Sequence, residues 1–510
     1  MGSKTAIPMS ERILEWVLFR FRWIFVILFV LPASVIYDQY FALRNWLVFK
    51  LNSAPKAHDR KVAIIQKQIR DWNDNGRQQK LCTARAGFLT MSFRFPKYKK
   101  NMLGIKTDQL VDILEIDKQN ETIRVEPMVT MGHLTRLLLP HGYTLPIVPE
   151  LDDLTVGGMV NGCGVESSSK KYGLFQHICV QYEVVTANGE LVVTRKENSE
   201  HNSLFYGIPW SHGTLGFLVA VTIRIISCKP FVKLTYNPVF GSDVTERLRE
   251  AAVSTENEFV EGIAYSPESA VIMTGEFSDS PPKNAKVNAI GRWYKPWFFK
   301  HVENILINKE SVTEYIPLRH FYHRHSKSIF WELQDLIPFG NNPIYRYLLG
   351  WALPPKVSLL KLTTPKPIRN LYDRHHVIQD LLIPLTHLND AVKLIDEEIG
   401  VYPLWLCPFK LPSYPGLIRN RSGADLIFID VGIYGNAERK HYDARESTRK
   451  LEKFVRDAQG AQMLYADTYM NAAEFWTMFD STLYDWLRIQ YDCKTAFPDV
   501  FEKVCREARE

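Results

Sequence analysis

The feature that most constrains this chain is a short glycine-rich stretch. Four glycines, Gly157, Gly158, Gly162 and Gly164, fall within eight residues, with polar side chains among and around them. Glycine has no Cβ, so the backbone N–H groups of such a stretch can approach a ligand closely. A pyrophosphate is held by a cradle of N–H donors of this kind. The stretch therefore predicts either a phosphate-binding segment or a glycine-rich surface loop.

Two common nucleotide-binding motifs do not fit this stretch. A Walker A loop requires Gly-Lys followed by Ser or Thr, which does not occur here. A dinucleotide-binding motif of the form GxGxxG requires a third glycine, but Ser167 stands three residues after Gly164. The sequence therefore disfavours a Rossmann dinucleotide site.

The length of 510 residues is too great for one hydrophobic core and predicts two or three domains. Hydrophobic residues make up 46% and charged residues 23%, which is typical of a globular protein. The formal net charge of +6, from 62 basic and 56 acidic residues, is too balanced for a nucleic-acid-binding protein. It is compatible with a mild preference for membrane surfaces.

The seven cysteines include no CxxC pair and their number is odd, so we expect free thiols in a reducing compartment rather than disulfides. His323 and His325 are two residues apart, a spacing that suits neither a zinc-binding helix nor a zinc finger. We therefore expect no metal site.

Residues 23–43 contain a single charged side chain, Asp38. Twenty-one helical residues span about 31 Å, close to the thickness of the hydrocarbon layer. Trp23, Tyr37 and Tyr40 suit the membrane interfaces. The segment predicts an uncleaved membrane anchor. A cleaved signal peptide, whose cleavage site would be poor, and a helix lying in the interface are the alternatives.

Hydrophobic periodicity predicts an α+β unit after this segment. Residues 60–75 are expected to form an amphipathic helix, and Asn188-Gly189 to form the turn of a β-hairpin. The other elements expected in this unit are strands at residues 90–94, 113–116, 122–125 and 217–226, and a helix at residues 131–139.

A second unit follows from residue 229. It is expected to contain strands at residues 232–236, 260–265, 270–274 and 426–432, and a helix at residues 381–397. After residues 463–467 the pattern becomes helical. The aromatic residues at 294–299 are expected to line a ligand channel, to dock on a membrane or to belong to the core.

The order of motifs resembles the FAD domain of the vanillyl-alcohol oxidase superfamily. It runs from Thr155-Val-Gly-Gly through Gly162-x-Gly164 and Tyr172-Gly173 to Gly213-Thr-Leu-Gly216. The resemblance implies an α+β fold, with a PCMH-type FAD-binding domain of two α/β subdomains and an α+β substrate (cap) domain, preceded by one N-terminal membrane helix.

The expected division is a membrane anchor at 1–45, the FAD-binding domain at 46–228, the substrate domain at 229–455 and a segment returning to the flavin at 456–510. In this superfamily an upstream loop also contacts the pyrophosphate. Many relatives carry a histidine bonded to the flavin where this chain has Phe88, so the resemblance implies noncovalent FAD. The cofactor contacts that it implies are Arg85, Gly87, Thr155, Val156, Gly157, Gly158, Met159, Val160, Asn161, Gly162, Cys163, Gly164, Val165, Glu166, Ser167 and Gly216.

Longer runs resemble the delta(24)-sterol reductase family, at residues 150–158, 166–169, 171–179, 294–304, 328–335, 337–343 and 463–467. This resemblance implies an FAD enzyme that uses NADPH to reduce the side-chain delta-24 double bond of sterols. It further implies an endoplasmic reticulum membrane protein with a single-pass anchor and a cytosolic catalytic domain. Other sterol-biosynthesis enzymes or a second copy of the chain are compatible protein partners. The alternatives are a flavin oxidase or dehydrogenase of the same fold acting on a small alcohol, and a non-enzymatic sterol-binding protein.

The implied substrate is an alkene that no carbonyl activates. Protonation of its less substituted carbon gives a tertiary cation, which hydride from reduced flavin can quench. The candidate proton donors are Tyr465, Asp467 and Glu332, with His320, Tyr322 and His323 as further candidates. For each of them, core packing or a surface hydrogen bond is an alternative role. Tyr465 is favoured because the tail of the family folds back towards the flavin.

Overall fold

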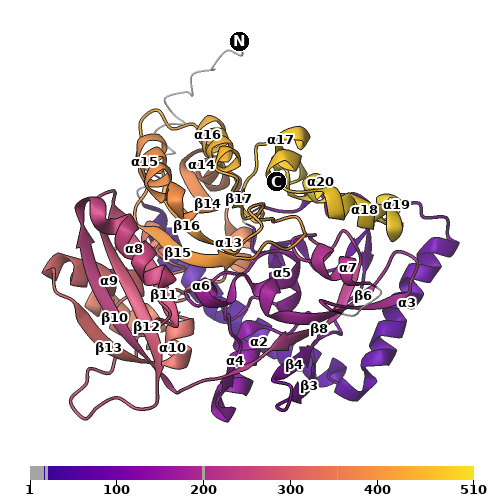
Figure 1. Cartoon of the computed structure of the whole chain (residues 1–510), viewed down its shortest axis with the longest axis horizontal. Coiled ribbons are helices and arrows are strands. Elements are labelled where there is room, and N and C mark those ends of the chain that lie inside the picture. The colour runs from indigo at the N-terminus through magenta and orange to yellow at the C-terminus, as the bar shows by residue number, and fades with distance from the viewer. Residues whose placement is uncertain (1–16, 18–20, 93, 198–200, 353, 510) are drawn as a thin grey trace.

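The computed structural model describes residues 17, 21–92, 94–197, 201–352 and 354–509. In this part of the chain two large sheets lie side by side, with the C-terminal helices above the first (Figure 1). The mixture of helices and antiparallel sheets confirms the predicted α+β class. All seven cysteines are free.

The first large sheet has five strands in the order β3–β4–β8–β6–β7. The predicted hairpin is confirmed, because β6 pairs antiparallel with β7 and Gly189 adopts a φ of +80° in the turn between them. The strands are β3 (Ile113–Asp117), β4 (Thr122–Val125), β6 (Cys179–Val185), β7 (Leu191–Arg195) and β8 (Phe217–Arg224). Short strand pairs beside it are β1 (Leu81–Thr83) with β2 (Leu103–Ile105), and β5 (Tyr143–Thr144) with β9 (Ile226–Ser227).

The predicted amphipathic helix is confirmed as α3 (His58–Asp74). Its apolar stripe of Val62, Ile65, Ile69 and Trp72 is buried, as the spacing required. The other helices of this unit are α4 (Met131–Leu138), α5 (Val156–Asn161), α6 (Ser169–Tyr172) and α7 (Asn202–Gly207).

The second large sheet has eight strands in the order β13–β10–β12–β11–β15–β16–β14–β17. They are β10 (Phe231–Phe240), β11 (Phe259–Ser266), β12 (Ser269–Ser278), β13 (Val312–Pro317), β14 (His376–Pro384), β15 (Leu404–Leu411), β16 (Leu426–Asn436) and β17 (Ala461–Gln462). Its helices are α8 (Val244–Val253), α9 (Phe298–Asn308), α10 (Leu318–Tyr322), α11 (Glu332–Leu336), α12 (Pro343–Leu349), α13 (Val357–Thr363), α14 (Lys366–His375), α15 (Leu388–Glu398) and α16 (Ala444–Asp457).

Two expected elements are wrong. Residues 381–384 belong to strand β14, and α15 begins only at Leu388, because a short apolar run does not by itself distinguish a buried strand from a buried helix. Residues 90–92 form no strand. Thr90 follows a short 3₁₀ turn, and its hydroxyl donates to the carbonyl of Gly87 at 2.9 Å. Phe93 lies outside the described residues.

A buried ion cluster joins the two units. The Arg324 guanidinium donates to Glu261 Oε1 on β11 at 2.6 Å and to Glu166 Oε1 of the first unit at 3.1 Å. All three side chains are almost fully buried. Removing one partner of such a group leaves a buried charge uncompensated, at a cost of about 3–5 kcal/mol. The cluster therefore fixes the orientation of one unit against the other.

The C-terminal segment returns to the first unit. Its helices are α17 (Ala472–Met478), α18 (Thr482–Gln490), α19 (Cys493–Ala496) and α20 (Val500–Val504). The Phe497 ring packs on Phe217 of β8 with 5.5 Å between ring centroids, and Tyr484 is hydrogen-bonded to Thr214 at 2.6 Å. Residues 463–467 thereby lie between the two units. The division of the chain at residues 45, 228 and 455 stays a prediction.

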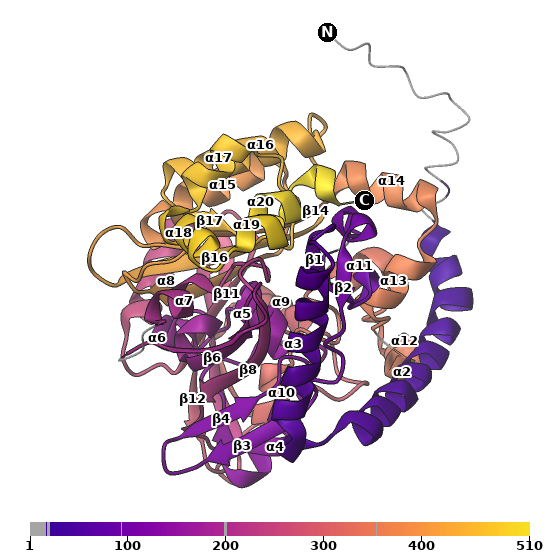
Figure 2. The same cartoon turned by 90° about the vertical axis from the view of Figure 1, so that its right-hand side faces the viewer.

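An apolar helix runs along one side of the molecule (Figure 2). It covers Phe21–Asn52, has a window with a mean hydropathy of 1.8, and is long and apolar enough to cross a membrane. It comprises a π-helical turn, η1 (Val26–Val30), and α2 (Leu31–Asn52). The single apolar N-terminal helix expected from the sequence is confirmed. Residues 1–16 and 18–20 of the expected anchor lie outside the described residues.

Candidate functional site

A large cavity of about 1890 Å³ lies between the two units. It is lined by α5, by one face of strands β14 to β16, by residues 463–465 and by part of α2. Pockets for a single small molecule usually have volumes of roughly 300–1,000 Å³. This cavity is therefore large enough for two organic molecules bound next to each other.

The glycine-rich stretch forms one end of the cavity. Thr155 caps α5, with its Oγ1 accepting a hydrogen bond from the Gly158 N–H at 3.3 Å. A Cβ on Gly157 would lie 2.8 Å from Pro127 Cβ, whereas one on Gly158 would meet only Thr155 Oγ1 within 4 Å. Gly157 is therefore required for close packing, and Gly158 leaves space at the cavity.

Arg85 lies beside this glycine end, and no carboxylate among the described residues is hydrogen-bonded to its side chain. Its Nη1 donates to Thr155 Oγ1 at 3.3 Å and its Nη2 to the Leu89 carbonyl at 3.2 Å, while its buried Nε has no hydrogen-bond partner among the described residues. Burial lowers the pKa of Arg85. A buried, incompletely satisfied guanidinium at a cavity is suited to bind an anion.

Three further cations surround Arg85, and they also donate to carbonyl groups. Lys99 Nζ donates to the Arg85 carbonyl at 2.6 Å, and Arg509 Nη2 donates to the Leu464 carbonyl at 2.6 Å. Burial, together with the neighbouring Lys99, lowers the pKa of Lys503 to about 8. This end of the cavity is strongly positive and would stabilise a bound phosphate.

The structure brings most of the predicted cofactor contacts to the cavity but not all of them. Those that line it are Arg85, Thr155, Gly157, Gly158, Met159, Asn161, Gly162, Cys163, Gly164, Val165 and Gly216. Val156 and Val160 are fully buried in the core. Gly87 packs against Pro96. Glu166 and Ser167 are placed away from the cavity, where Glu166 binds Arg324 and the Ser167 carbonyl accepts from the N–H of Val260 at 2.8 Å.

Another part of the cavity lining, the acid end, carries a cluster of acids and phenols on one face of the sheet. The hydroxyls of Tyr434 and Tyr465 donate to the two carboxylate oxygens of Asp380. Asp430 lies one strand away, on β16, and neither of its oxygens has a hydrogen-bond partner among the described residues. A Cβ on Gly432 would lie 2.6 Å from the Tyr434 hydroxyl, so this glycine makes room for the Tyr434 ring to lie along the sheet.

The environment of this cluster raises the pKa values of its carboxyl groups. Burial raises the pKa of Asp430 far above its ordinary value, and the nearby Asp380 and Glu150 raise it further. Burial likewise raises the pKa of Asp380, and it raises that of Glu150 to about 8. This environment favours the protonated form of Asp430, which has a proton to donate into the cavity. Burial and Asp380 raise the pKa of Tyr465, which makes its phenol a weaker acid.

The proton-donor candidates from the sequence are dispersed. Tyr465 and Glu332 line the cavity, and Glu332 pairs with His376 Nε2 at 2.7 Å. Asp467 is held by Arg94 and is not among the described residues that line the cavity. The structure therefore places Asp467 in an ion pair, outside the described lining of the cavity.

The histidine-rich segment also lies outside the cavity lining. His323 contacts the Glu150 carbonyl at 2.7 Å, and Tyr322 accepts a hydrogen bond from Thr144 at 3.0 Å. The sequence analysis missed Asp380, Asp430 and Glu150. The available signal was an isolated acid in the apolar strand that contains Asp430.

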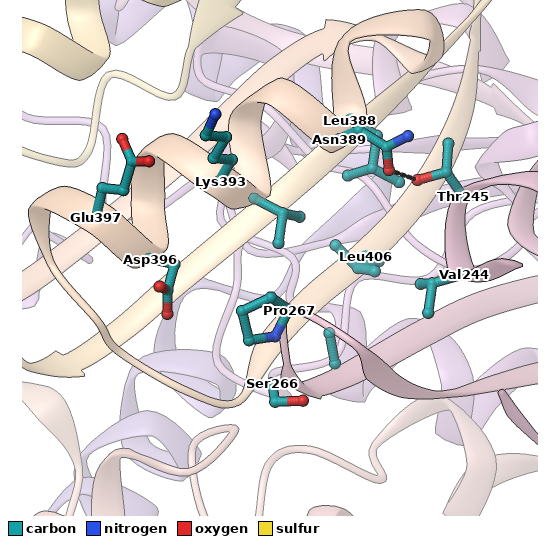
Figure 3. A pocket seen from close by; sticks show the side chains of 12 residues that line it. Val244, Thr245, Ser266, Pro267, Leu388, Asn389, Lys393, Asp396, Glu397 and Leu406 are labelled. Atoms are coloured by element: carbon teal, nitrogen blue, oxygen red, sulfur yellow. Dashed lines mark hydrogen bonds between the residues drawn. The ribbon is translucent and has the colours of Figure 1, made fainter. Parts of the chain in front are cut away.

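A smaller pocket of about 190 Å³ lies between α8, α15 and β11 (Figure 3). Lys393, Asp396 and Glu397 line it on one side and the apolar Val244 and Leu406 on the other. It shares no lining residue with the large cavity. Among the described residues no group of three or more metal-binding side chains is assembled.

Comparison with known proteins identifies the family. The FAD binding domain family matches residues 67–195. A delta(24)-sterol reductase from Homo sapiens is 54% identical over 497 residues, covering 97% of this chain and 96% of that protein. The delta(24)-sterol reductase homolog dhcr-24 of Caenorhabditis elegans is 52% identical, covering 98% and 97%. A delta(24)-sterol reductase of Arabidopsis thaliana is 39% identical, covering 98% and 94%.

The chain belongs to the delta(24)-sterol reductase family.

Membership of the delta(24)-sterol reductase family confirms an oxidoreductase, and the matched domain confirms both the FAD cofactor and the PCMH-type fold. The matched residues run from within α3 to the end of β7 and include the glycine end of the cavity. FAD carries a negatively charged pyrophosphate, and the positive end of the cavity, with the open space at Gly158, fits that group. The family and the apolar helix together indicate an association with membranes.

Proposed function

We propose that this protein reduces the side-chain delta-24 double bond of a sterol, with FAD as its cofactor and NADPH as the electron source. The observation that supports the proposal best is a single cavity with two chemically different ends. One end is cationic and lined by glycine, and the other presents Asp430 on the sheet, a buried carboxyl group whose raised pKa favours its protonated form.

The cationic end would hold the FAD pyrophosphate. Arg85 is held in place there by Thr155 and Leu89, and it keeps its unpartnered Nε as a donor. The N-terminus of α5 lies beside it. Phe88 also lines the cavity and has no nitrogen that could bond to the flavin, so the FAD would be held noncovalently. FAD supplies the hydride once NADPH has reduced it.

The acidic end would protonate the alkene. Asp430 donates its carboxyl proton to the less substituted carbon of the double bond, which leaves a tertiary cation on the other carbon and a carboxylate on Asp430. Hydride addition to that cation completes the reduction, and a proton from solvent restores the acid. Asp380 accepts hydrogen bonds from Tyr434 and Tyr465 and so fixes both rings beside the reacting carbons. The aromatic faces would stabilise the cation.

The proposed location in the cell follows from the need for NADPH and from the free thiols. The protein would act at the endoplasmic reticulum membrane with its catalytic bulk in the cytosol, where NADPH is available and its free thiols persist. Other sterol-biosynthesis enzymes or a second copy of the chain would be its protein partners. A single-pass helix and a helix in the plane of the membrane are both compatible with this location.

The test is a spectrum combined with a turnover assay of the purified full-length protein. The protein should be yellow, NADPH should bleach it without oxygen, and desmosterol should restore the colour. Acid should release the flavin intact into the supernatant. A colourless protein would support the non-enzymatic sterol-binding alternative. Bleaching by small polar alcohols would support the oxidase alternative.

A further inference from the structure

The apolar helix at Phe21–Asn52 stays on the protein body along its whole length. Thirty-two helical residues span about 48 Å, which exceeds the roughly 30 Å hydrocarbon layer. A helix held near both ends cannot stand across a bilayer while the body remains outside. Its contacts are Trp23 with Phe339 at 5.1 Å between ring centroids, the Tyr37 hydroxyl with Ser358 Oγ at 2.9 Å, and Phe49 with His133 at 6.0 Å between ring centroids.

The helix also forms a wall of the large cavity. Tyr37, Phe41 and Val48 are among the residues that line it. A helix that left the body to cross the membrane would open the cavity to water. The helix α2 must therefore stay against the body for the cavity to remain enclosed.

The outer face of the helix is apolar and uncovered. The exposed fractions of Ile36, Leu43 and Leu51 are 72%, 57% and 82%. On the inner face Val26, Val30 and Leu31 are buried against the body. A helix that is hydrophobic all round needs an apolar environment on both sides. The body supplies one side, and a lipid layer would supply the other.

A second segment extends this face. Figure 2 shows α12 beside α2, and α2 packs against the next turn, η8 (Gly350–Ala352). Ile344 and Leu348 on α12 are 72% and 67% exposed, and Trp351 in η8 is 58% exposed. A contiguous apolar patch of this kind marks an interaction surface.

The charges next to the patch indicate its partner. Residues 337–372, which include α12 and η8, contain five basic and no acidic side chains. Lys361 is buried and Lys356 pairs with Asp153, which leaves the exposed Lys366 and the half-buried Arg346 and Arg369 beside the patch. Basic segments next to an apolar surface are attracted to anionic lipid headgroups. A bilayer surface therefore matches both the apolar patch and the charge of this segment.

We propose that residues 21–52 lie in the plane of the membrane and that α12 and η8 belong to the same lipid-binding surface. The protein then rests on one leaflet, and the cavity wall formed by α2 faces the lipid. An apolar substrate can reach the cavity from the bilayer without crossing water. The route of the substrate from the bilayer rests on the proposed sterol substrate, whereas the lipid-binding surface does not.

The first test uses the full-length protein in microsomes. The double variant Ile344→Glu with Leu348→Glu should raise several-fold the fraction released by alkaline carbonate. The matched control is Trp486→Glu with Ile489→Glu on α18, where the two side chains are 51% and 64% exposed, far from α2 in Figure 2. Bound FAD in both variants reports folding. Equal release of the two variants would overturn the α12 surface, whether or not sterol is the substrate.

The second test locates the two ends of the helix. Val17→Cys and Lys50→Cys should both react with a membrane-impermeant maleimide added outside sealed microsomes, above the background of the seven native cysteines. Protection of one end until detergent is added would establish a spanning helix and overturn the proposal. A change from dimer to monomer on Leu348→Glu, with unchanged carbonate release, would identify the patch as a contact between two copies and would also overturn it.

Discussion

The two ends of the large cavity are built in different ways. The glycine and cation end comes mainly from two short segments, residues 83–90 and 155–164, in which the functional residues are neighbours in sequence. The acid end is assembled from Asp380, Asp430, Tyr434 and Tyr465, on two strands and a later loop. A site built from neighbouring residues can be recognised as a sequence motif. A site spread over a sheet can be recognised only once the strands are paired in register.

The largest effect is expected at the glycine end. Gly158→Val places side-chain atoms in the space that the proposal gives to the pyrophosphate, and the structure shows no packed neighbour there other than Thr155. We expect a folded protein without flavin and without activity. Flavin absorbance and thermal unfolding measure the two properties. A variant that keeps stoichiometric FAD would move the pyrophosphate elsewhere.

Gly157→Ala is the matched control, because its Cβ would press on Pro127 in the core rather than enter the cavity. When the FAD-free forms are compared, this variant should unfold at a lower temperature than the unsubstituted protein, and the Gly158 variant should not.

The next largest effect is expected at the acid end. Asp430→Asn keeps the shape of the side chain but removes the proton donor. FAD binding and flavin reduction by NADPH should be retained, and sterol reduction should fall roughly 10²-fold or more. Stopped-flow measurement of the two half-reactions separates these steps.

The pH dependence of the sterol step provides a second test of the acid end. The active form of Asp430 is protonated, and its pKa is raised by burial, so the sterol step should slow as the pH rises through that pKa. The asparagine variant should lose this alkaline decline. Loss of flavin reduction in the variant, or an unchanged sterol step, would contradict the assignment.

A smaller effect is expected from Tyr465→Phe. The Tyr465 hydroxyl donates to Asp380, so its removal deletes one hydrogen bond to a buried carboxyl group and should slow the sterol step about tenfold. Asp467→Asn is the control, because Asp467 pairs with Arg94 and should affect stability rather than the sterol step. A loss confined to the sterol step in the aspartate variant would reverse the two roles.

Local sequence was sufficient to predict those elements whose structure depends on one short segment alone. Asn188-Gly189 predicted its hairpin because the turn needs a residue at positive φ, and Gly189 provides it. The buried apolar face of α3 was predicted from the helical spacing of its apolar residues. The helix expected at residues 381–397 failed at its first seven residues, of which 381–384 are strand. Leu381 and Leu382 are apolar in either element, and only pairing with β16 makes them a strand.

By itself the sequence determined the apolar N-terminal helix, the family and the glycine-rich segment that lines the cavity, since each depends on residues that are close together in the chain. Tertiary structure decided that Glu166 holds Arg324 instead of facing the cavity, and that Asp467 pairs with Arg94. It also decided that Asp430 is buried with no hydrogen-bond partner in the part of the chain that the structure describes. The physical reason is that a carboxyl group's role depends on its solvation and on the charges around it, and folding brings those charges from distant parts of the chain.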